Sequence, residues 1–398
     1  MARTSDYIYW RGDIPFSISP VNEADEYLIC MIGMLDLRPV VPEDGTYIPI
    51  RRALELYCSG GGEMELGALT SSTLVPTILS IQKAERFADV MLSGFRLHIS
   101  DEEGIQFAAL TVRMPGGKHY VTFRGTDDTL VGWRENFMLT IETPVPAQKE
   151  AAEYLRWAAE NYPGQLVVAG HSKGGNLAVY AASAVEEEVQ SRVEKVISFD
   201  GPGFRPEFLE DPGYRRIRGK IRNLLPQHTM VGALMFRDAE YSIVKSDALF
   251  FGAHDAFNWE VEPNGAFVRE ADRSPASKAF DQAMKAVLEG MSVPERREFI
   301  EQLFGTLGAG GATTITEIAD RKVWEVMHTL VSVTKEPEVK KMALDALEQV
   351  ARDYLNEKGK SMSVLRLANL FKGRKKEDED GGEAGEGTEP SADGWYDG

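Results

Sequence analysis

A Gly-x-Ser-x-Gly sequence at residues 170–174 constrains the fold of this chain more than any other feature. An apolar, strand-like run leads into it, and an alanine-rich, helix-like run follows it. A serine at so tight a strand-to-helix turn is held in a strained conformation with its hydroxyl exposed. The glycines Gly170 and Gly174 avoid collisions with the neighbouring strand and helix. The sequence therefore predicts a nucleophile elbow with Ser172 as the nucleophile.

The charge of the chain narrows the range of partners. Its 398 residues include 62 acidic and 44 basic side chains, which gives a formal net charge of −18. We expect no nucleic acid as a partner, because phosphate binding needs a basic surface. The two cysteines, Cys30 and Cys58, are too few for a disulfide framework or a zinc site and are typical of a reducing compartment. We expect neither a cofactor nor a metal, since no ligand spacing such as His-Glu-x-x-His occurs.

Neither a signal peptide nor a membrane span is predicted. Residues 1–20 lack a basic start followed by a long apolar run. No window approaches the roughly 18 uninterrupted apolar residues of a transmembrane helix. We therefore expect a cytoplasmic protein without an integral membrane segment.

Strand and helix patterns alternate through the first two thirds of the chain. A Pro-Gly-Gly turn at 115–117 separates two alternating runs, which predicts a hairpin over 105–124. A helix is predicted at 146–161, strands at 165–169, 194–199 and 220–225, and a bent strand or hairpin at 241–251. This alternation predicts an α/β fold with a mostly parallel central sheet flanked by helices on both faces.

The pattern changes after about residue 270. We predict one domain over 1–265, which includes an N-terminal helical segment, and a C-terminal helical appendage over 270–370. Helices are expected in the appendage at 276–291, 294–307, 317–334 and 337–357. The remaining tail, 373–398, is rich in Gly, Glu and Asp and is expected to be disordered.

Acyl transfer through a serine needs a base and an acid that orients it. His254 is the favoured base, because it follows an apolar, strand-like run in a loop position. His228, also in a loop after the elbow, is the alternative. His171 lies beside Ser172, where its side chain is expected to point away and to act as a packing or hydrogen-bonding residue.

The acid is harder to assign from sequence. Asp200 ends the strand that follows the elbow helix, so it is expected at the same sheet edge as the elbow; its other interpretation is a turn former before Gly-Pro. Asp247 and Asp255 are near His254 in sequence, but an adjacent residue such as Asp255 cannot normally face its neighbour's ring.

Donors for an oxyanion are expected from two places. The backbone N–H of Lys173 follows the nucleophile at a helix N-terminus. The segment Phe-Arg-Gly-Thr at 123–126 ends a strand, and its Thr126 offers an N–H and a hydroxyl. Arg124 is expected to anchor that loop by ion pairing, with Asp127 and Asp128 as candidate partners.

These segments together resemble the class 3 lipase branch of the α/β-hydrolases. The likeness is closer to a group of bacterial proteins related to those lipases, the DUF2974 or Mbeg1-like family. It covers about 1–265 and rests on YIYWRGD at 7–13, FRGTDDTLVGWRENF at 123–137, GHSKGGNLA at 170–178, FDGPGF at 199–204, LPQHTMVG at 225–232 and the run from IVKS to HDAFNW at 243–259.

The resemblance implies a lipase-like hydrolase with Ser172 as nucleophile, His254 as base, and the N–H groups of Thr126 and Lys173 at the oxyanion. Class 3 lipases carry their acid near the turn where this chain reads Gln-His-Thr-Met at 227–230. Without an aspartate there, either Asp200 has taken the role, or the site is a dyad, or it does not turn over.

Three functions follow as hypotheses. The first is a serine hydrolase that cleaves carboxylic ester or lipid acyl bonds of a small-molecule substrate through a Ser172 acyl-enzyme. The second is a catalytically silent hydrolase-fold protein that binds a protein partner through the helical appendage. The third is an acyltransferase, in which an acceptor other than water reaches the same intermediate.

Overall fold

The computed structural model of the chain describes residues 2–38, 40–60, 73–127, 129–249, 251–308 and 341. Met1–Val350 forms one compact unit, to which the description below belongs. The helices predicted at 317–334 and 337–357 and the tail at 373–398 lie outside the described residues, apart from residue 341.

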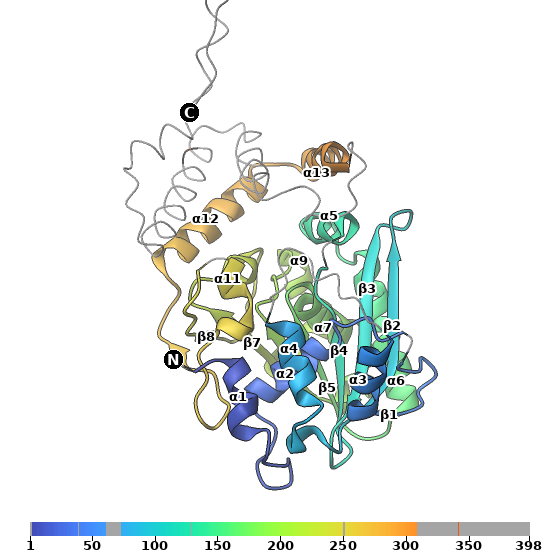
Figure 1. Cartoon of the computed structure of the whole chain (residues 1–398). Coiled ribbons are helices and arrows are strands. Elements are labelled where there is room, and N and C mark those ends of the chain that lie inside the picture. The colour runs from blue at the N-terminus through green and yellow to red at the C-terminus, as the bar shows by residue number, and fades with distance from the viewer. Residues whose placement is uncertain are drawn as a thin grey trace, which may run out of the picture. The chain divides into compact units, whose positions relative to one another are not determined.

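Nine strands in the described residues form a single sheet, and their order in space is their order in the sequence (Figure 1). Strands β4 to β8 are parallel, and the pairs that flank them are antiparallel. The strands are β1 (Ile48–Pro49), β2 (Met91–Ser100), β3 (Ile105–Arg113), β4 (His119–Phe123), β5 (Leu166–His171), β6 (Val193–Phe199), β7 (Ile221–Pro226), β8 (Tyr241–Val244) and β9 (Arg269–Glu270).

Sequential strand order decides which helices cover which face. Right-handed crossovers between neighbouring parallel strands place their helices on one face of a sheet. Leu166 and Val168 of β5 pack there, in a core built mainly by the helices between the parallel strands. These helices are α6 (Pro146–Asn161), α7 (Lys173–Ala184), α8 (Glu187–Arg192), α9 (Pro206–Leu209) and α10 (Pro212–Ile217).

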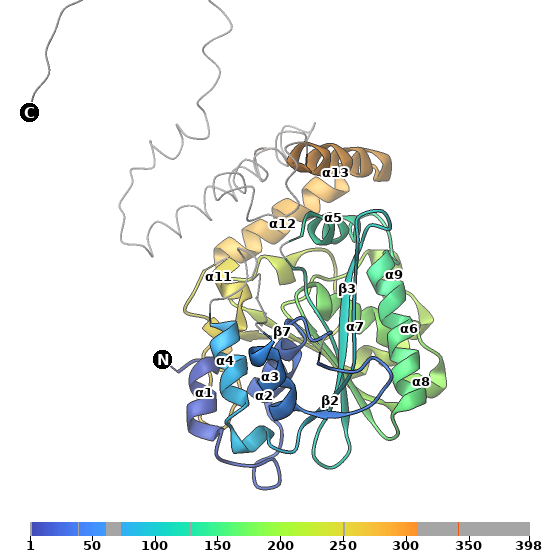
Figure 2. The ribbon, with the colours of Figure 1, turned by 45° about the vertical axis from the view of Figure 1, so that its right-hand side comes forward.

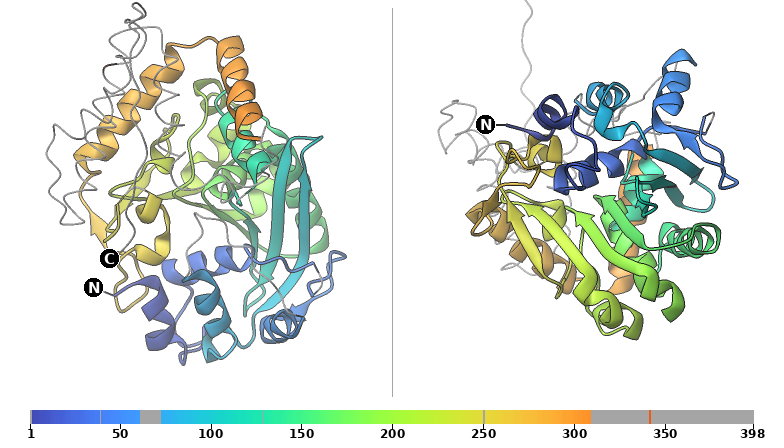
Figure 3. Two further views of the ribbon diagram at one scale, coloured as in Figure 1. Left: turned by 45° about the horizontal axis from the view of Figure 1, so that its top comes forward. Right: turned by 90° about the horizontal axis from the view of Figure 1, so that it is seen from below.

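The N-terminal helices cover the other face of the sheet, as the right-hand view of Figure 3 shows. Val167 and Ala169 alternate along β5 with Leu166 and Val168 and pack into this second core. The helices are α1 (Thr4–Arg11), α2 (Glu23–Ile32), α3 (Ile50–Ser59) and α4 (Leu74–Ile81), with a short 3-10 helix η1 (Glu85–Phe87). The result is the α/β-hydrolase-like arrangement that the sequence predicts.

Most predicted elements occur where the patterns place them. The hairpin is β3 paired with β4, and α6 has the predicted bounds. The strand expected over 241–251 is wrong in its second half: β8 ends at Val244, because its outer partner β9 pairs only with Ile243 and Val244. His254 therefore ends a short helix, α11 (Phe251–His254), instead of following a strand.

Three helices gather at the end of the sheet where β5 runs into the elbow (Figure 2). They are α5 (Leu130–Met138), α12 (Pro275–Glu289) and α13 (Val293–Gly308). The last two are the described part of the predicted appendage. Phe299, Ile300 and Phe304 of α13 pack against Ile141 and the apolar side of α5. Short 3-10 helices complete the described elements: η2 (Arg218–Lys220), η3 (Val231–Ala233) and η4 (Ala256–Asn258).

Candidate active site

Ser172 lies at a strained turn between β5 and α7. Its backbone is left-handed, with φ 59° and ψ −131°, which is rare for a residue other than glycine. The turn is crowded on both sides. A Cβ on Gly170 would lie 2.2 Å from the Gly174 carbonyl carbon, and a Cβ on Gly174 would lie 2.1 Å from the Phe123 carbonyl oxygen. The Ser172 N–H donates to Phe199 O at 2.9 Å, which fixes the turn to β6.

Asp200 and His254 are brought together although 54 residues separate them. His254 Nδ1 donates to Asp200 Oδ2 at 2.7 Å. The Asp200 side chain is fully buried, and its Oδ1 accepts from the Thr229 hydroxyl at 2.5 Å and from the Gly232 N–H at 3.1 Å. Thr229 lies in the turn at 227–230, which contains no aspartate. This turn therefore supplies a hydrogen-bond donor to Asp200, the carboxylate at the end of β6.

The other acid and base candidates are engaged elsewhere. Asp247 pairs with Arg3, and the Asp255 carboxylate caps η4 by accepting from the Phe257 N–H. His228 Nε2 lies 2.8 Å from Gln227 Nε2 in a side-chain hydrogen bond. His228 is not among the residues that line the cavity beside Ser172.

Ser172 and His254 line the same cavity. Within the described residues, no hydrogen bond joins the Ser172 hydroxyl to the His254 ring. Catalytic hydrogen bonds are often long without substrate and shorten only in the complex. The other ring nitrogen of His254, Nε2, is the atom left for a proton transfer, because Nδ1 is bound to Asp200.

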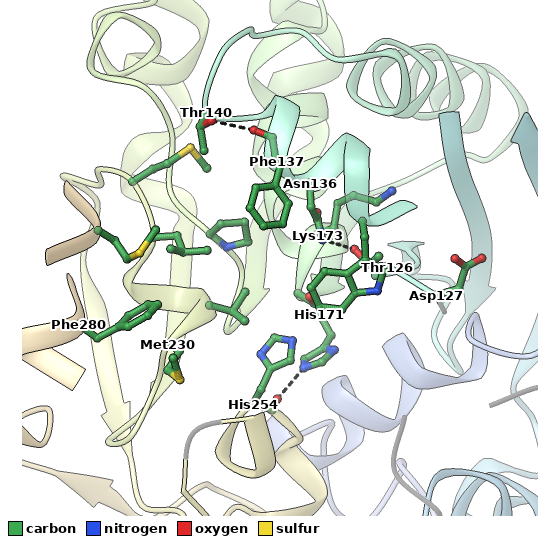
Figure 4. A pocket seen from close by; sticks show the side chains of 18 of the residues that line it. Thr126, Asp127, Asn136, Phe137, Thr140, His171, Lys173, Met230, His254 and Phe280 are labelled. Carbon is green, nitrogen blue, oxygen red and sulfur yellow. Dashed lines mark hydrogen bonds between the residues drawn. The ribbon is translucent and has the colours of Figure 1, made fainter. Parts of the chain in front are cut away.

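His171 does not point away from this cavity, as the sequence led us to expect, but lines it (Figure 4). Its Nε2 donates to the His254 carbonyl oxygen at 2.8 Å, and the two rings lie 4.5 Å apart between centroids. Burial, helped by the nearby His254 ring, lowers the pKa of His171 to about 3. His171 is therefore a neutral hydrogen-bond donor that holds the backbone of His254.

The two predicted oxyanion residues lie at one side of the cavity, where the loop after β4 approaches the elbow. A Cβ on Gly125 would lie 2.8 Å from His171 O, so the loop passes close to β5. The Thr126 hydroxyl accepts from Asn136 Nδ2 at 2.5 Å (Figure 4). In the part of the chain that the structure describes, the N–H groups of Thr126 and Lys173 have no hydrogen-bond acceptor.

The Lys173 side chain has a role that the sequence analysis missed. It is fully buried, and its Nζ donates to Glu135 Oε2 at 2.8 Å and to Gln106 O at 2.6 Å. The Glu135 carboxylate also accepts from the N–H groups of Gln106 and Ala147. A lysine inside a buried elbow needs such a partner, but nothing in the sequence indicates which of the acidic residues supplies it. The expected ion pair of Arg124 with Asp127 is present at 3.9 Å, and Asp128 lies outside the described residues.

The cavity beside Ser172 has a volume of about 220 Å³ and an apolar lining. Methionines are prominent in that lining, and two of the helices that form it, α12 and α13, belong to the predicted appendage. The apolar lining residues include Met31, Met34, Leu74, Trp133, Phe137, Met230, Val231, Leu234, Met235, Phe280, Met284, Leu288, Met291, Phe299 and Ile300.

The described residues contain no group of three or more His, Cys, Asp or Glu side chains that could hold a metal ion. None of the described helices is long and apolar enough to cross a membrane.

A family model described as Mbeg1-like matches residues 81–305, which is more than half of the chain. No curated protein shows significant sequence similarity to this chain.

Several solved structures are similar to the chain. The Rhizomucor miehei lipase propeptide complex is 15% identical, with 48% of this chain and 63% of that chain covered and a TM-score of 0.32. A nonglycosylated lipase of Yarrowia lipolytica is 15% identical, with 48% and 75% covered and a TM-score of 0.33. A lipase from Rhizopus microsporus var. chinensis is 12% identical, with 68% and 84% covered and a TM-score of 0.31. The chain spans less than two thirds of the Rhizomucor chain.

Proposed function

The chain belongs to the Mbeg1-like family, and from this premise we propose that it is a serine hydrolase that cleaves carboxylic esters. The observation that carries the proposal is the hydrogen bond of 2.7 Å between buried Asp200 and His254, in the cavity that Ser172 lines. A buried carboxylate bound to Nδ1 holds a histidine in the tautomer whose Nε2 can accept a proton.

Each proposed role follows from position. His254 Nε2 takes the proton of the Ser172 hydroxyl as the oxygen attacks the ester carbonyl. The N–H groups of Lys173 and Thr126 hold the oxyanion, and the α7 N-terminus adds positive potential there. The protonated His254 then gives its proton to the departing alkoxide, which leaves an ester on Ser172. Water, deprotonated by His254, releases the acid and restores the serine.

The lining of the cavity supports an apolar substrate. Its walls consist mainly of methionine, phenylalanine and aliphatic side chains, although Asp127, Asn136, Thr140, Asp255 and Arg296 also line it. We therefore propose an ester or lipid with an apolar acyl group as the substrate. Transfer to an acceptor other than water uses the same acyl-enzyme and differs only in its last step. Two free cysteines, one of them exposed, support the proposed cytoplasmic location.

A catalytically silent, partner-binding protein is the alternative. The absence of a hydrogen bond between Ser172 and His254 in the described residues favours it. The hydrogen bond between Asp200 and His254 weighs against a silent protein. The sequence favours that alternative only because the usual aspartate is missing, and Asp200 supplies a carboxylate in its place.

Hydrolysis of p-nitrophenyl butyrate by purified variants tests the proposal. We expect Ser172→Ala and His254→Ala to lower kcat by several orders of magnitude, and Asp200→Asn by about 10³ to 10⁴, because the amide would favour the wrong histidine tautomer. The exposed Ser191→Ala is the matched control and should be unaffected. Full activity in His254→Ala would refute the assignment, and a loss of less than tenfold in Asp200→Asn would show that the site works as a dyad.

A further inference from the structure

Helices α12 and α13 form a wall of the cavity in which Ser172 lies. Phe280, Met284 and Leu288 of α12 and Phe299 and Ile300 of α13 are among its lining residues. Figure 4 shows Phe280 beside Met230 at one side of the cavity and Thr126 at the other. These helices follow β9, so the wall comes from the segment that the sequence predicts to be a helical appendage.

The N-terminus of α12 is fixed to the machinery around Asp200. Ser277 Oγ donates to Thr229 O at 2.6 Å, and the Ser274 N–H donates to Gln227 O at 2.7 Å. Thr229 is the residue whose hydroxyl donates to Asp200. The position of α12 is therefore tied to the turn that supports the proposed acid.

Helix α13 is fixed to the opposite rim of the cavity. Arg296 Nη1 donates to Thr140 O at 2.8 Å, and Arg134 pairs with Glu301 at 2.5 Å. Apolar contacts of Phe299 and Ile300 with α5 and Ile141 lie beneath these polar contacts. Both helices are thus part of the site's framework and leave an apolar space between them and Ser172.

We infer that the α12–α13 wall binds the acyl chain of the substrate and selects its length. This inference rests on the proposed function. In the covalent intermediate the acyl group stays on Ser172 while the alcohol departs. The wall beside Ser172 therefore faces the acyl chain. Methionine side chains are unbranched and adaptable and suit a linear, flexible chain. The ligand class is therefore the ester of a linear, unbranched acid, with its chain against Met284 and Phe280.

The test is a series of p-nitrophenyl esters from acetate to laurate, assayed with the full chain. For the wild type, kcat/KM should rise by about fourfold for each methylene that the wall buries and then level off. Met284→Trp fills the cavity, so the ratio of laurate to acetate activity should fall at least tenfold. Met284→Ala enlarges the cavity and should move the preferred length upward. Gln282→Trp, exposed on the same helix, should leave the profile unchanged.

The outcomes separate the inference from the function on which it rests. If both Met284 variants keep the wild-type profile while acetate is still hydrolysed, the inference is wrong and the proposed function stands. A second series, with a constant acetyl group and alcohols of increasing length, must not depend on residue 284; dependence there would assign the wall to the alcohol and overturn the inference. If no ester is hydrolysed and Ser172 takes up no acyl group, both proposals fail. Thermal unfolding checks that each variant is folded.

Discussion

Ser172 and Asp200, the proposed nucleophile and acid, both have left-handed backbones, with φ of 59° and 47°. Such conformations cost of order 1–3 kcal/mol for residues other than glycine and persist only where the surroundings enforce them. Here they are enforced by backbone hydrogen bonds, from Ser172 N–H to Phe199 O and from Asp200 N–H to Leu224 O. Both residues stand at the ends of neighbouring parallel strands, where a sheet can hold them rigidly.

Gly174 is predicted to tolerate no side chain. A Cβ there would lie 2.1 Å from a backbone oxygen, that of Phe123, which cannot move without shifting β4. We expect Gly174→Ala to lower the free energy of unfolding by about 3 kcal/mol or more, measured by urea denaturation. Gly219→Ala, where a Cβ meets no atom within 4 Å, is the control and should change it little. Equal stability of the two variants would contradict the crowded elbow.

His171 makes a prediction about pH. Its pKa of about 3 in the folded chain lies well below the 6.5 of an unperturbed histidine. Between these values the unfolded chain binds the additional proton, so His171 costs stability as the pH falls below about 6.5 and contributes nothing above it. The melting temperature should therefore fall less from pH 7 to pH 5 in His171→Gln than in the wild type. Parallel pH profiles would show that His171 is not held neutral.

At the scale of elements, the buried pair of Lys173 and Glu135 joins the elbow helix α7 to α5. Both side chains are fully buried, so removal of one leaves the other as an unpaired buried charge. The exposed pair of Arg134 and Glu301 joins α5 to α13 in a solvated setting and provides a comparison within the same helix.

We expect Lys173→Met to destabilise the fold by about 3 kcal/mol or more in urea denaturation, and Arg134→Met by no more than about 1 kcal/mol. The variants also bear on the proposed oxyanion site, because α5 carries Asn136, whose side chain donates to the Thr126 hydroxyl. If Lys173→Met is as stable as the wild type, the pair is not the link between these helices.

Several elements were predictable because their signals are local. The Pro-Gly-Gly turn gives the hairpin of β3 and β4, and the apolar periodicity of 146–161 gives α6. The apolar run before His254 predicts a strand where β8 has already ended at Val244, because apolar residues carry no information about where the neighbouring strand β9 ends. Asp200 could be named as a candidate because the carboxyl ends of neighbouring parallel strands meet at one sheet edge.

At the scale of the whole molecule, contacts between distant segments decide what the sequence could not. The sequential strand order leaves one face of the sheet to the N-terminal helices, and no local pattern indicates that choice. The cavity beside Ser172 combines Met31, Phe137 and Met284, which no motif connects. The first two helices of the predicted appendage at 270–370 line this cavity, which no pattern in the sequence indicates, and the boundaries predicted for that segment stay predictions.

The central claim is that Ser172 is an activated nucleophile. Intact-mass analysis after treatment with a fluorophosphonate tests it most directly, with the wild type, Ser172→Ala and Asp200→Asn compared at equal time. We predict one adduct on the wild type, none on Ser172→Ala, and much slower labelling of Asp200→Asn. An unlabelled, folded wild type, or an adduct that persists in Ser172→Ala, would contradict the account.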